Sequence, residues 1–369
     1  MIKFCKNCVM PSSKPNIRFI DGICTSCYFH LNEKKKKIDW NFRKKEFDNL
    51  ISKIKKKKNQ GFDVLVPVSG GKDSITQVHY MLKAGLRVLA LNVDYGFKTD
   101  IGEYNLNLIP KMGANLFTFR PNMKLHRRVL KISFEEYGDP DLMSHCLLHA
   151  LPIKTAIKFN IPLVFLGENS AYEYSGDKTY DEKKMSYKWF ENYAANNGMT
   201  PNKFSKKHNI SFDLMDIYNL PNKNELNKTN AVFTSYFFKW DSEINLKIAK
   251  KYGFKTLNKN GEGTYRNYVG IDEKINRIHQ YLKYLKFGYG RATDHACEDI
   301  RNGRINRHKA IRLVKKFDRV PVTKYYYKEF INMIGASEKK FFSTLKKYTN
   351  KKLFNINGKN FLFKFKNFN

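Results

Sequence analysis

One turn of this sequence has the composition of a phosphate site. It follows the apolar run Val64–Val68 and consists of six residues: Ser69, Gly70, Gly71, Lys72, Asp73 and Ser74. Two glycines let a backbone approach an anion closely, a lysine adds a mobile positive charge, and serines add hydroxyl donors. A strand that leads through such a turn into a helix also presents backbone N–H groups at the positive end of the helix dipole. The aspartate would repel phosphate unless a cation lay between them, so Asp73 is the candidate ligand of Mg²⁺.

Two familiar nucleotide motifs do not fit this turn. The pattern G-x-x-x-x-G-K-[ST] would require glycine at Val66 and serine or threonine at Asp73, and the dinucleotide pattern G-x-G-x-x-G does not occur here. An ordinary glycine-rich turn between a strand and a helix is the alternative without chemistry. The preceding apolar run and the following helical pattern favour the phosphate site.

The cysteines indicate a structural metal. Cys5-x2-Cys8, fifteen residues, and Cys24-x2-Cys27 have the spacing of a four-thiolate zinc site, with two sulfurs from each knuckle. Four sulfurs leave no open coordination position, so we expect the zinc to hold together a module too small for a core of its own. A redox dithiol or an iron–sulfur cluster is the alternative. Two further cysteines, Cys146 and Cys297, are expected to fill space in the interior.

These residues must be positioned by an α/β fold. Short apolar runs alternate with helical patterns, which predicts a doubly wound parallel sheet covered by helices on both faces. The predicted strands are Val64–Val68, Val88–Val93, Leu116–Phe119 and Pro162–Leu166. The predicted helices are Ser74–Ala84, Ile101–Met112, Ser144–Phe159, Asp241–Lys251, Asp272–Phe287 and Arg307–Phe317.

Composition shifts divide the chain into six segments. We expect a small zinc-ribbon-like module over 1–30, a helical connector over 31–60 and the nucleotide-binding core over 61–170. A polar stretch over 171–230 is typical of an insertion or lid. A further core and substrate-binding segment, mainly helical, follows over 231–317, and a basic C-terminal tail covers 318–369.

The chain carries a formal net charge of +34, which would ordinarily indicate a polyanionic partner. Lysine, asparagine, isoleucine, phenylalanine and tyrosine are abundant together, however, as codon drift in an AT-rich genome produces. The lysines also lie in short runs, which are more typical of solvated segments than of a nucleic-acid surface. We therefore do not expect nucleic acid as a partner. No apolar run approaches the length of a membrane span, and we expect a cytoplasmic protein without membrane insertion.

The turn S-G-G-x-D-S after a strand resembles the pyrophosphate loop of the ATP pyrophosphatase (PP-loop) superfamily, whose core is similar to that of the adenine nucleotide alpha hydrolases. Members cleave ATP to AMP and pyrophosphate and adenylate an oxygen that a nitrogen or sulfur nucleophile then displaces. The resemblance implies ATP and Mg²⁺ as ligands, with Asn92 and Asp94 near adenine and ribose and Gly167 and Glu168 at the edge of the site. Asp94 could equally be a helix cap or a turn residue.

Several stretches together resemble the N-acetyl sugar amidotransferases of bacterial surface-polysaccharide (LPS O-antigen) and flagellin-glycan biosynthesis, including the pseudaminic and legionaminic acid type. They are FCKNCVMPSSKPNIRF, GICTSC, VPVSGGKDS, HCLLHALPIKTAIKFNIPLVFLGENSAYEYSGD and GYGRATDHACEDIRNGRINRHKA. That family converts a sugar acetamido group to an acetamidino group with ATP and ammonia. The ammonia comes from a glutaminase subunit resembling that of histidine biosynthesis, possibly with a cyclase-like subunit. Ser175 departs from the Glu-Tyr-Gly-Gly pattern expected there.

The resemblance also implies the sites. Lys72, Asp73 and Glu168 would be catalytic, and an acetamido sugar or sugar nucleotide would be the substrate. The expected substrate-binding residues are Asn169, Glu173, Tyr174, Arg291, Asp294, His295 and Arg301. The late polar cluster, which also holds Thr293 and Arg304, could instead be a helix-cap and ion-pair network. His126, His145 and His149 are expected to be structural.

Two other functions remain open from the sequence. A PP-loop enzyme of tRNA modification, of the thiolation or lysidine type, would use the basic surface to bind RNA. A zinc-bearing scaffold whose loop merely binds nucleotide would have no enzymatic activity.

Overall fold

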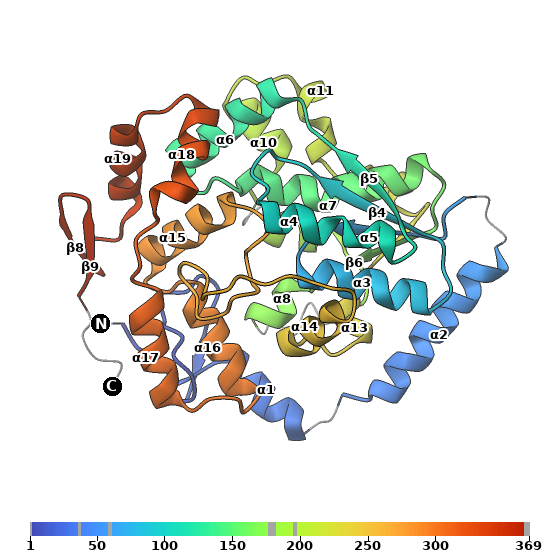
Figure 1. Ribbon diagram of the computed structural model, residues 1–369, viewed down its shortest axis with the longest axis horizontal. Coiled ribbons are helices and arrows are strands. Elements are labelled where there is room, and N and C mark those ends of the chain that lie inside the picture. Colours follow the sequence, from blue (N-terminus) through green and yellow to red (C-terminus); the bar gives the residue numbers. More distant parts are fainter. Residues whose placement is uncertain (1, 36–37, 58–60, 176–181, 195–197, 365–369) are drawn as a thin grey trace.

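A computed structural model of the chain (Figure 1) describes residues 2–35, 38–57, 61–175, 182–194 and 198–364, except the side chains of 32–35 and 174–175. Its centre is a parallel sheet of five strands in the order β5-β4-β3-β6-β7. The strands are β3 (Val64–Val68), β4 (Val88–Val93), β5 (Asn115–Phe119), β6 (Leu163–Leu166) and β7 (Asn230–Phe233). The chain first builds outward from β3 to β5 and then returns to the other side of β3. The doubly wound α/β fold expected from the sequence is therefore confirmed, with its switch point between β3 and β6.

The strands alternate between two buried faces. Val64, Val66 and Val68 of β3 face a core shared with α2 and α3, whereas Leu65 faces a core shared with α6 and α7. Because both faces of the central strands are covered, β3 and β6 are continuous apolar runs, whereas the edge strand β5 is partly exposed. The helices around the sheet are α2 (Trp40–Lys56), α3 (Lys72–Lys83), α4 (Asp100–Leu106), α5 (Leu108–Lys111), α6 (Met123–Tyr137) and α7 (Leu142–Lys158).

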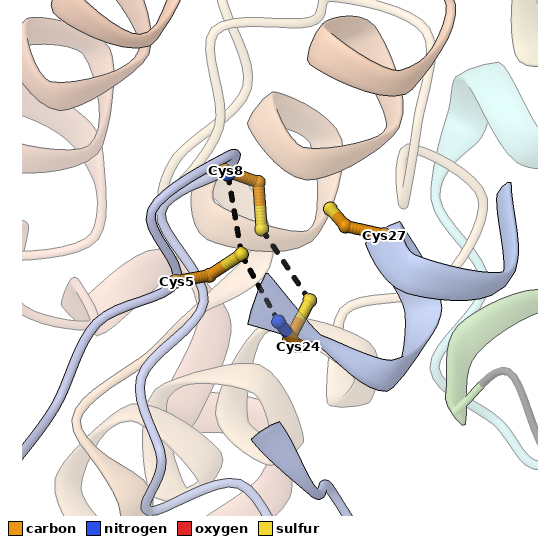
Figure 2. Close-up of side chains that lie close together, drawn as sticks. All are labelled: Cys5, Cys8, Cys24 and Cys27. Atoms are coloured by element: carbon orange, nitrogen blue, oxygen red, sulfur yellow. Dashed lines mark hydrogen bonds between the residues drawn. The ribbon is translucent and has the colours of Figure 1, made fainter. Parts of the chain in front are cut away.

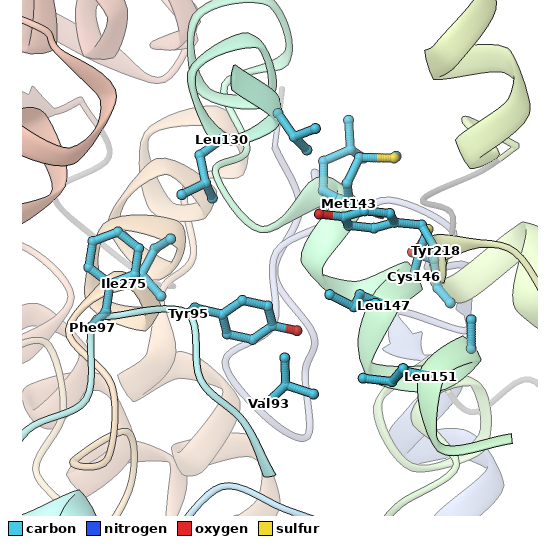
Figure 3. Packing of buried hydrophobic residues seen from close by; sticks show 14 of the residues in the cluster. Val93, Tyr95, Phe97, Leu130, Met143, Cys146, Leu147, Leu151, Tyr218 and Ile275 are labelled. Atoms are coloured by element: carbon cyan, nitrogen blue, oxygen red, sulfur yellow. Dashed lines mark hydrogen bonds between the residues drawn. The ribbon is translucent and has the colours of Figure 1, made fainter. Parts of the chain in front are cut away.

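The larger hydrophobic core contains Cys146, one of the two cysteines outside the C-x-x-C pairs. Figure 3 shows Cys146 of α7 beside Tyr218, with Tyr95 and Phe97 on the side of β4. Cys146 is fully buried, and burial raises the pKa of its thiol to about 12. It is the space-filling cysteine that the sequence indicated.

Short helices make up the 171–230 segment, and part of them pack on α7. They are α8 (Ser170–Ser175), α9 (Tyr187–Trp189), η2 (Phe190–Ala194), α10 (Pro201–Lys207), α11 (Phe212–Met215), η3 (Asp216–Tyr218) and α12 (Lys223–Leu226). The segment is thus folded onto the core wherever the structure describes it.

The rest of the chain is mainly helical, as expected. Its elements are α13 (Thr234–Phe237), α14 (Ser242–Lys250), α15 (Ile275–Phe287), α16 (Arg291–Arg301), α17 (Arg307–Phe317), α18 (Lys324–Ile334), α19 (Glu338–Tyr348), β8 (Phe354–Asn357) and β9 (Asn360–Phe363). The last two helices pack on α15 and α6, so the basic segment 318–369 carries ordered structure over its described residues.

The N-terminal module folds against the helical part. It contains the two-stranded ribbon β1 (Phe19–Ile20) and β2 (Ile23–Cys24), followed by α1 (Thr25–Lys35). Val9 and Met10 share a small core with Tyr289, Ala296 and other residues of α16 and α17, and Figure 1 shows these segments side by side. Over the described residues, no helix has both the length and the apolar character needed to cross a membrane.

Two predicted helices differ in the structure. The helix expected over Ile101–Met112 is divided into α4 and α5 at Asn107, and Pro110 within α5 lacks the N–H that a continuous helix would use. The helix expected from Asp272 begins only at Ile275. Asp272 and Glu273 lie instead in the loop before α15, which brings their carboxylates to the site described next.

Candidate functional site

A cavity of about 1180 Å³ opens at the carboxyl ends of β3 and β6. This is the switch point of the sheet, where the loops after the two strands diverge and leave a crevice, the usual ligand position in doubly wound folds. The loop after β3 forms one wall. The loop after β6, the segment before α15, the helices α15 and α16, and the N-terminal module supply the others.

The turn after β3 has a fixed backbone. Gly70 has a positive φ of 96°, and a Cβ built there would lie 2.4 Å from the carbonyl oxygen of Gly102. Ser74 Oγ accepts from the N–H of Ser69 at 2.9 Å, and Ser69 Oγ accepts from the N–H of Gly71 at 3.3 Å. Among the described residues no side chain caps the start of α3. The N–H groups of Ser69 and Gly71 are thus used within the turn, whereas the uncapped start of α3 directs a helix N terminus at the cavity, the arrangement that binds phosphate.

Lys72 and Asp73 are held at the mouth of this turn. Lys72 is buried, and its Nζ lies 2.7 Å from Oδ2 of Asp73 and 5.9 Å from the ring centroid of Tyr268. Oδ1 of Asp73 accepts from Nδ2 of Asn245 at 2.7 Å. Both residues line the cavity, as do Ser69, Gly71 and Ser74, whereas Gly70 acts through the backbone alone.

The end of β4 places its two expected residues differently. Asn92 is buried behind the cavity, where its Oδ1 accepts from Lys98 Nζ at 3.2 Å and its Nδ2 has no partner among the described residues. Asp94 accepts from Arg120 Nε at 3.0 Å and from the N–H of Gly96 at 2.8 Å. Its carboxylate thus serves the turn after β4 and does not line the cavity, which matches the alternative role left open by the sequence.

Lys98 links the phosphate turn to an acidic pair that the sequence analysis missed. Its Nζ donates to the carbonyl oxygen of Ser69 at 3.3 Å and lies 3.4 Å from Oε1 of Glu273. Burial raises the pKa of Glu273 to about 8, although Lys98 opposes the shift. Asp272 lies beside Gly71, with Oδ2 3.5 Å from the position of a Cβ built there. Two carboxylates therefore lie close to the phosphate turn, one directly beside Gly71 and the other joined to it through Lys98.

The loop after β6 contributes Gly167 and Glu168, which both line the cavity, and Glu173 does so from α8. Asn169 is buried, accepts from Trp189 Nε1 at 2.9 Å and donates its backbone N–H to Ser235 at 2.9 Å. Asn169 thus holds Trp189, which lines the cavity, but Asn169 itself does not line it. The side chain of Tyr174, an expected substrate contact, lies outside the described residues.

The late polar cluster lies on and beside α16. It contains a helix cap and also residues that face the cavity, the two roles that the sequence left open. Asp318 accepts from the backbone N–H groups of Gly290, Ala292 and Thr293, so it caps α16 and aims the helix at the cavity. Four expected substrate residues line the cavity: Arg291, Asp294, His295 and Arg301.

His295 is buried, and its Nδ1 is 2.8 Å from the hydroxyl of Thr264. Burial, aided by neighbouring cations, lowers the pKa of His295 well below its usual range, so it is a neutral hydrogen-bonding group.

The remaining arginine of the cluster is structural. Arg304 pairs with Asp241, Glu298 and Asp299, and Arg266 pairs with the last two at 2.8 and 2.7 Å. This network joins α14, α16 and the loop before Tyr268. It fixes the helical part against the core.

A second titratable cluster lines the cavity between α7 and α15. His279 Nδ1 lies 2.9 Å from Asp139 and 3.9 Å from Asp141. Burial alone would lower the pKa of His279, but the two carboxylates outweigh it and raise the pKa. Burial lowers the pKa of His145 and of His149 to about 4.

The four N-terminal cysteines come together in one cluster, as their spacing predicts. Their Sγ atoms lie within 4.8 Å of one another, and all four residues are buried. Figure 2 shows Cys5, Cys8 and Cys24 joined by hydrogen bonds, with Cys27 reaching in from α1. Backbone N–H groups donate to the sulfurs of Cys5 and Cys8, which favours thiolates. The set fits Zn²⁺, which would bind all four sulfurs as a structural ion.

Comparison with known proteins identifies a relative of the C-terminal part. Residues 262–367 match the family model described as LPS biosynthesis protein WbpG-like, C-terminal domain. None of the curated proteins matches the sequence.

Two solved structures are similar. One is NMN synthetase from Francisella tularensis, with 13% identity and a TM-score of 0.28 over 66% of this chain and 94% of that chain. The other is NAD+ synthetase from Burkholderia pseudomallei, with 12% identity and a TM-score of 0.26 over 62% of this chain and 92% of that chain. The assignment of the α/β core rests on the strand order given above. From the loop that carries Asp272 to β9, the chain is similar to the C-terminal domain of WbpG-like proteins of LPS biosynthesis.

Proposed function

We propose that this protein is an ATP-dependent, AMP-forming amidotransferase that converts an acetamido group of a sugar to an acetamidino group in bacterial surface-glycan biosynthesis. One observation carries the proposal. The phosphate turn after β3 opens into the same cavity as the loop and helices of the segment that matches the WbpG-like model of LPS biosynthesis. A nucleotide-binding core and a segment related to glycan biosynthesis thus share one site.

The size of the cavity supports two ligands. Pockets for a single small ligand have volumes of roughly 300–1,000 Å³, and this cavity is larger, about 1180 Å³. ATP on the turn would leave room for a sugar toward α15 and α16. Adenylation requires such a ternary arrangement, because the acetamido oxygen must reach the α-phosphorus in line with the departing pyrophosphate.

Each wall has a role in this reaction. The N–H groups at the start of α3 and Lys72 would bind the β- and γ-phosphates and stabilise the charge that develops on pyrophosphate. Mg²⁺ usually takes one or two carboxylates besides phosphate oxygens, and Asp73 and Asp272 flank the turn from two sides. Glu168 lies at the end of the neighbouring strand, beside the expected position of the α-phosphate.

The chemistry has two displacements. The acetamido oxygen attacks the α-phosphorus and pyrophosphate leaves, which gives an O-adenylyl imidate. Ammonia then attacks the imidate carbon, a proton leaves the nitrogen, and AMP departs with the former acetamido oxygen. Glu273, whose pKa burial raises to about 8, is the candidate to accept that proton in its ionised form, which becomes the main form only as the pH rises through this value.

Ammonia would come from a partner glutaminase resembling that of histidine biosynthesis, possibly with a cyclase-like subunit, in the cytoplasm. Cys146 and Cys297 are 0% and 1% exposed, which makes both unsuitable as a glutaminase nucleophile. The four other cysteines belong to the zinc site. An external ammonia source is therefore part of the proposal.

The test is a product analysis. The purified chain is incubated with ATP, Mg²⁺, an acetamido sugar nucleotide and ammonium chloride, which replaces the partner. We expect AMP and pyrophosphate in equal amounts and a product in which NH replaces one oxygen, detected by mass spectrometry. Lys72→Met should slow the reaction roughly 10²–10³-fold, whereas Lys83→Met, an exposed lysine on the same helix, should not change it. Formation of ADP, or turnover that ignores the sugar, would contradict the proposal.

A further inference from the structure

The segment between β4 and α4 contacts both the phosphate turn and the loop before α15. We call residues 97–102 the junction, and they include the start of α4. The junction pairs with that loop in the antiparallel sense, since the N–H of Thr99 donates to the carbonyl oxygen of Asp272 at 3.0 Å. The N–H of Lys274 in turn donates to the carbonyl oxygen of Phe97 at 2.9 Å. The junction thus joins the α/β core to the segment that matches the WbpG-like model.

Lys98 is the polar link within the junction. Its side chain is 10% exposed. Its Nζ lies 3.3 Å from the carbonyl oxygen of Ser69, 3.2 Å from Oδ1 of Asn92 and 3.4 Å from Oε1 of Glu273. These contacts use the three N–H donors that an ammonium group has. Ser69 and Glu273 line the cavity but Lys98 does not, so Lys98 holds two lining residues together from behind.

Gly102 is the steric link within the junction. A Cβ built on Gly102 would lie 2.5 Å from the carbonyl oxygen of Asp272 and 2.7 Å from its Cα. The carbonyl oxygen of Gly102 in turn meets the position of a Cβ built on Gly70. The backbones of the phosphate turn, of α4 and of the loop before α15 are therefore in direct contact, which is possible because residues 70 and 102 have no side chain.

These two links set the position of the acidic pair. Asp272 and Glu273 precede Ile275, the first residue of α15, so no helix holds them in place. A loop keeps a fixed position only through its contacts, and this loop has its contacts with the junction. Asp272 Oδ2 is thereby held 3.5 Å from the position of a Cβ built on Gly71, at the cavity.

We propose that Lys98 and Gly102 are positioning residues, which hold Asp272 at a fixed distance from the phosphate turn so that both act on one Mg²⁺-bound nucleoside triphosphate. Lys98 acts through its hydrogen bonds and Gly102 through close backbone contact, and neither lines the cavity. Mg²⁺ requires near-ideal octahedral ligands at roughly 2.0–2.1 Å, so a small shift of Asp272 would weaken its binding. The inference rests on the proposed function for the identity of the ligand, ATP with Mg²⁺.

Nucleotide binding to the full chain tests this assignment without turnover. ATP is titrated by calorimetry in the absence of any sugar, once with Mg²⁺ and once with EDTA. The readout is the ratio of the two dissociation constants, because a general loss of stability would weaken both titrations alike. We expect Mg²⁺ to tighten ATP binding to the wild type roughly tenfold or more. Asp272→Asn, which leaves the turn intact, should lose most of this gain.

Gly102→Ala changes the distance without changing any charge. Its methyl group would meet backbone atoms of Asp272, so the loop or α4 must shift, although alanine is the better helix former. We expect a loss of the Mg²⁺-dependent gain about as large as that of Asp272→Asn, with ATP binding in EDTA within about threefold of the wild type. The two substitutions together should add little to either one alone, because both remove the same contact.

Lys98→Met gives an independent variant, since it removes the ammonium group and keeps the length of the side chain. It should lose roughly fivefold or more of the gain, whereas Lys111→Met, which changes an exposed lysine of α5, should keep the gain. If thermal unfolding showed that Gly102→Ala does not fold, Lys98→Met would carry the test alone. A full Mg²⁺-dependent gain in either variant, or no gain in the wild type, would overturn the assignment. Because no step is catalysed, a failure to form AMP would count against the proposed function alone.

Discussion

The two glycines of the phosphate turn have different physical roles. Gly70 is required by the backbone, because its φ is positive and any Cβ would meet the carbonyl of Gly102. Gly71 has an ordinary φ of −79°, and a Cβ there would make normal contacts with Ser69 Oγ at 3.4 Å and Asp272 at 3.5 Å. One glycine permits the turn to form, and the other keeps space open in front of it.

Alanine at each position separates these roles. Gly70→Ala should lower the free energy of unfolding by about 2–3 kcal/mol, since it combines backbone strain with a steric clash. Gly71→Ala should change it by no more than about 0.5 kcal/mol, yet weaken ATP binding roughly tenfold or more, because the methyl group fills the approach to the phosphate donors. Denaturant unfolding and ATP titration measure the two effects. If Gly71→Ala bound ATP as the wild type does, the turn would not be the nucleotide site.

At the scale of elements, the site depends on how α16 and the zinc module are held together. Arg307 of α17 donates to the backbone carbonyl oxygen of Cys8 at 3.1 Å, and Cys297 of α16 packs beside the cysteine cluster. The module therefore packs on α16, which carries Arg291 and Arg301 at the cavity. Loss of the module's fold should disturb the position of α16 at the cavity before it disturbs the turn after β3.

The zinc site can be tested with two cysteine variants. Cys24→Ser should release the metal and lower Tm by several degrees, because the binding free energy of a structural zinc is part of the folding free energy. Cys297→Ser, which changes a buried thiol next to the cluster, should retain about one zinc per chain, since only four sulfurs complete the tetrahedron. Metal analysis and thermal unfolding give the answer. Retention of zinc by Cys24→Ser would show that the four cysteines are not the ligands.

The strands and helices differ in how well the sequence predicts them. The strands β3 and β6 are uninterrupted apolar runs and β4 is interrupted only by Asn92, and the sequence predicts β3 and β4 with their observed bounds. The short strand β7 follows a polar segment and was missed as a strand. Helix α16 was missed because its buried face includes polar residues such as His295 and Asp299, which hide the apolar period.

The residues of the site also differ in how well the sequence predicts them. The phosphate turn is a local pattern of consecutive residues, so its chemistry can be read directly from the sequence. Glu273 has no such signal, because its place at the site comes from a contact with Lys98, far away in the chain. Asp94 could be assigned only from the structure, which supplies its partner Arg120. Cavities assembled from distant segments depend on tertiary packing that no single stretch encodes.

At the scale of the whole molecule, one cavity joins three parts of the chain. The α/β core supplies the phosphate turn, the helical part supplies the opposite wall, and the N-terminal module closes a side. The net charge of +34 is spread over this assembly. Titratable groups at the joints, such as His279 of α15 against the loop before α7, should therefore make the stability of the whole chain depend on pH.

The sign of that dependence follows from the pKa of His279. Asp139 and Asp141 raise it above the ordinary value of 6.5, against burial and the nearby Lys283. The protonated imidazole therefore contributes stability that is fully present below pH 6.5 and is lost as the pH rises through the raised pKa. On the acid side, His279 helps to hold the pKa of Asp139 below 3.8 despite burial, so that contribution is lost only as the pH falls through this lowered value.

His279→Gln should thus lower the free energy of unfolding by about 1.5–3 kcal/mol between pH 4 and 6.5, the strength of a hydrogen bond to a charged group. The difference from the wild type should shrink as the pH rises beyond the raised pKa, where the wild-type imidazole is neutral as well. His308→Gln, an exposed histidine of α17, is the control and should show no such trend. Denaturant unfolding at a series of pH values measures it. A difference that stayed constant or grew above neutral pH would mean that His279 joins α15 to the core as a neutral residue and that the ion pair is not formed.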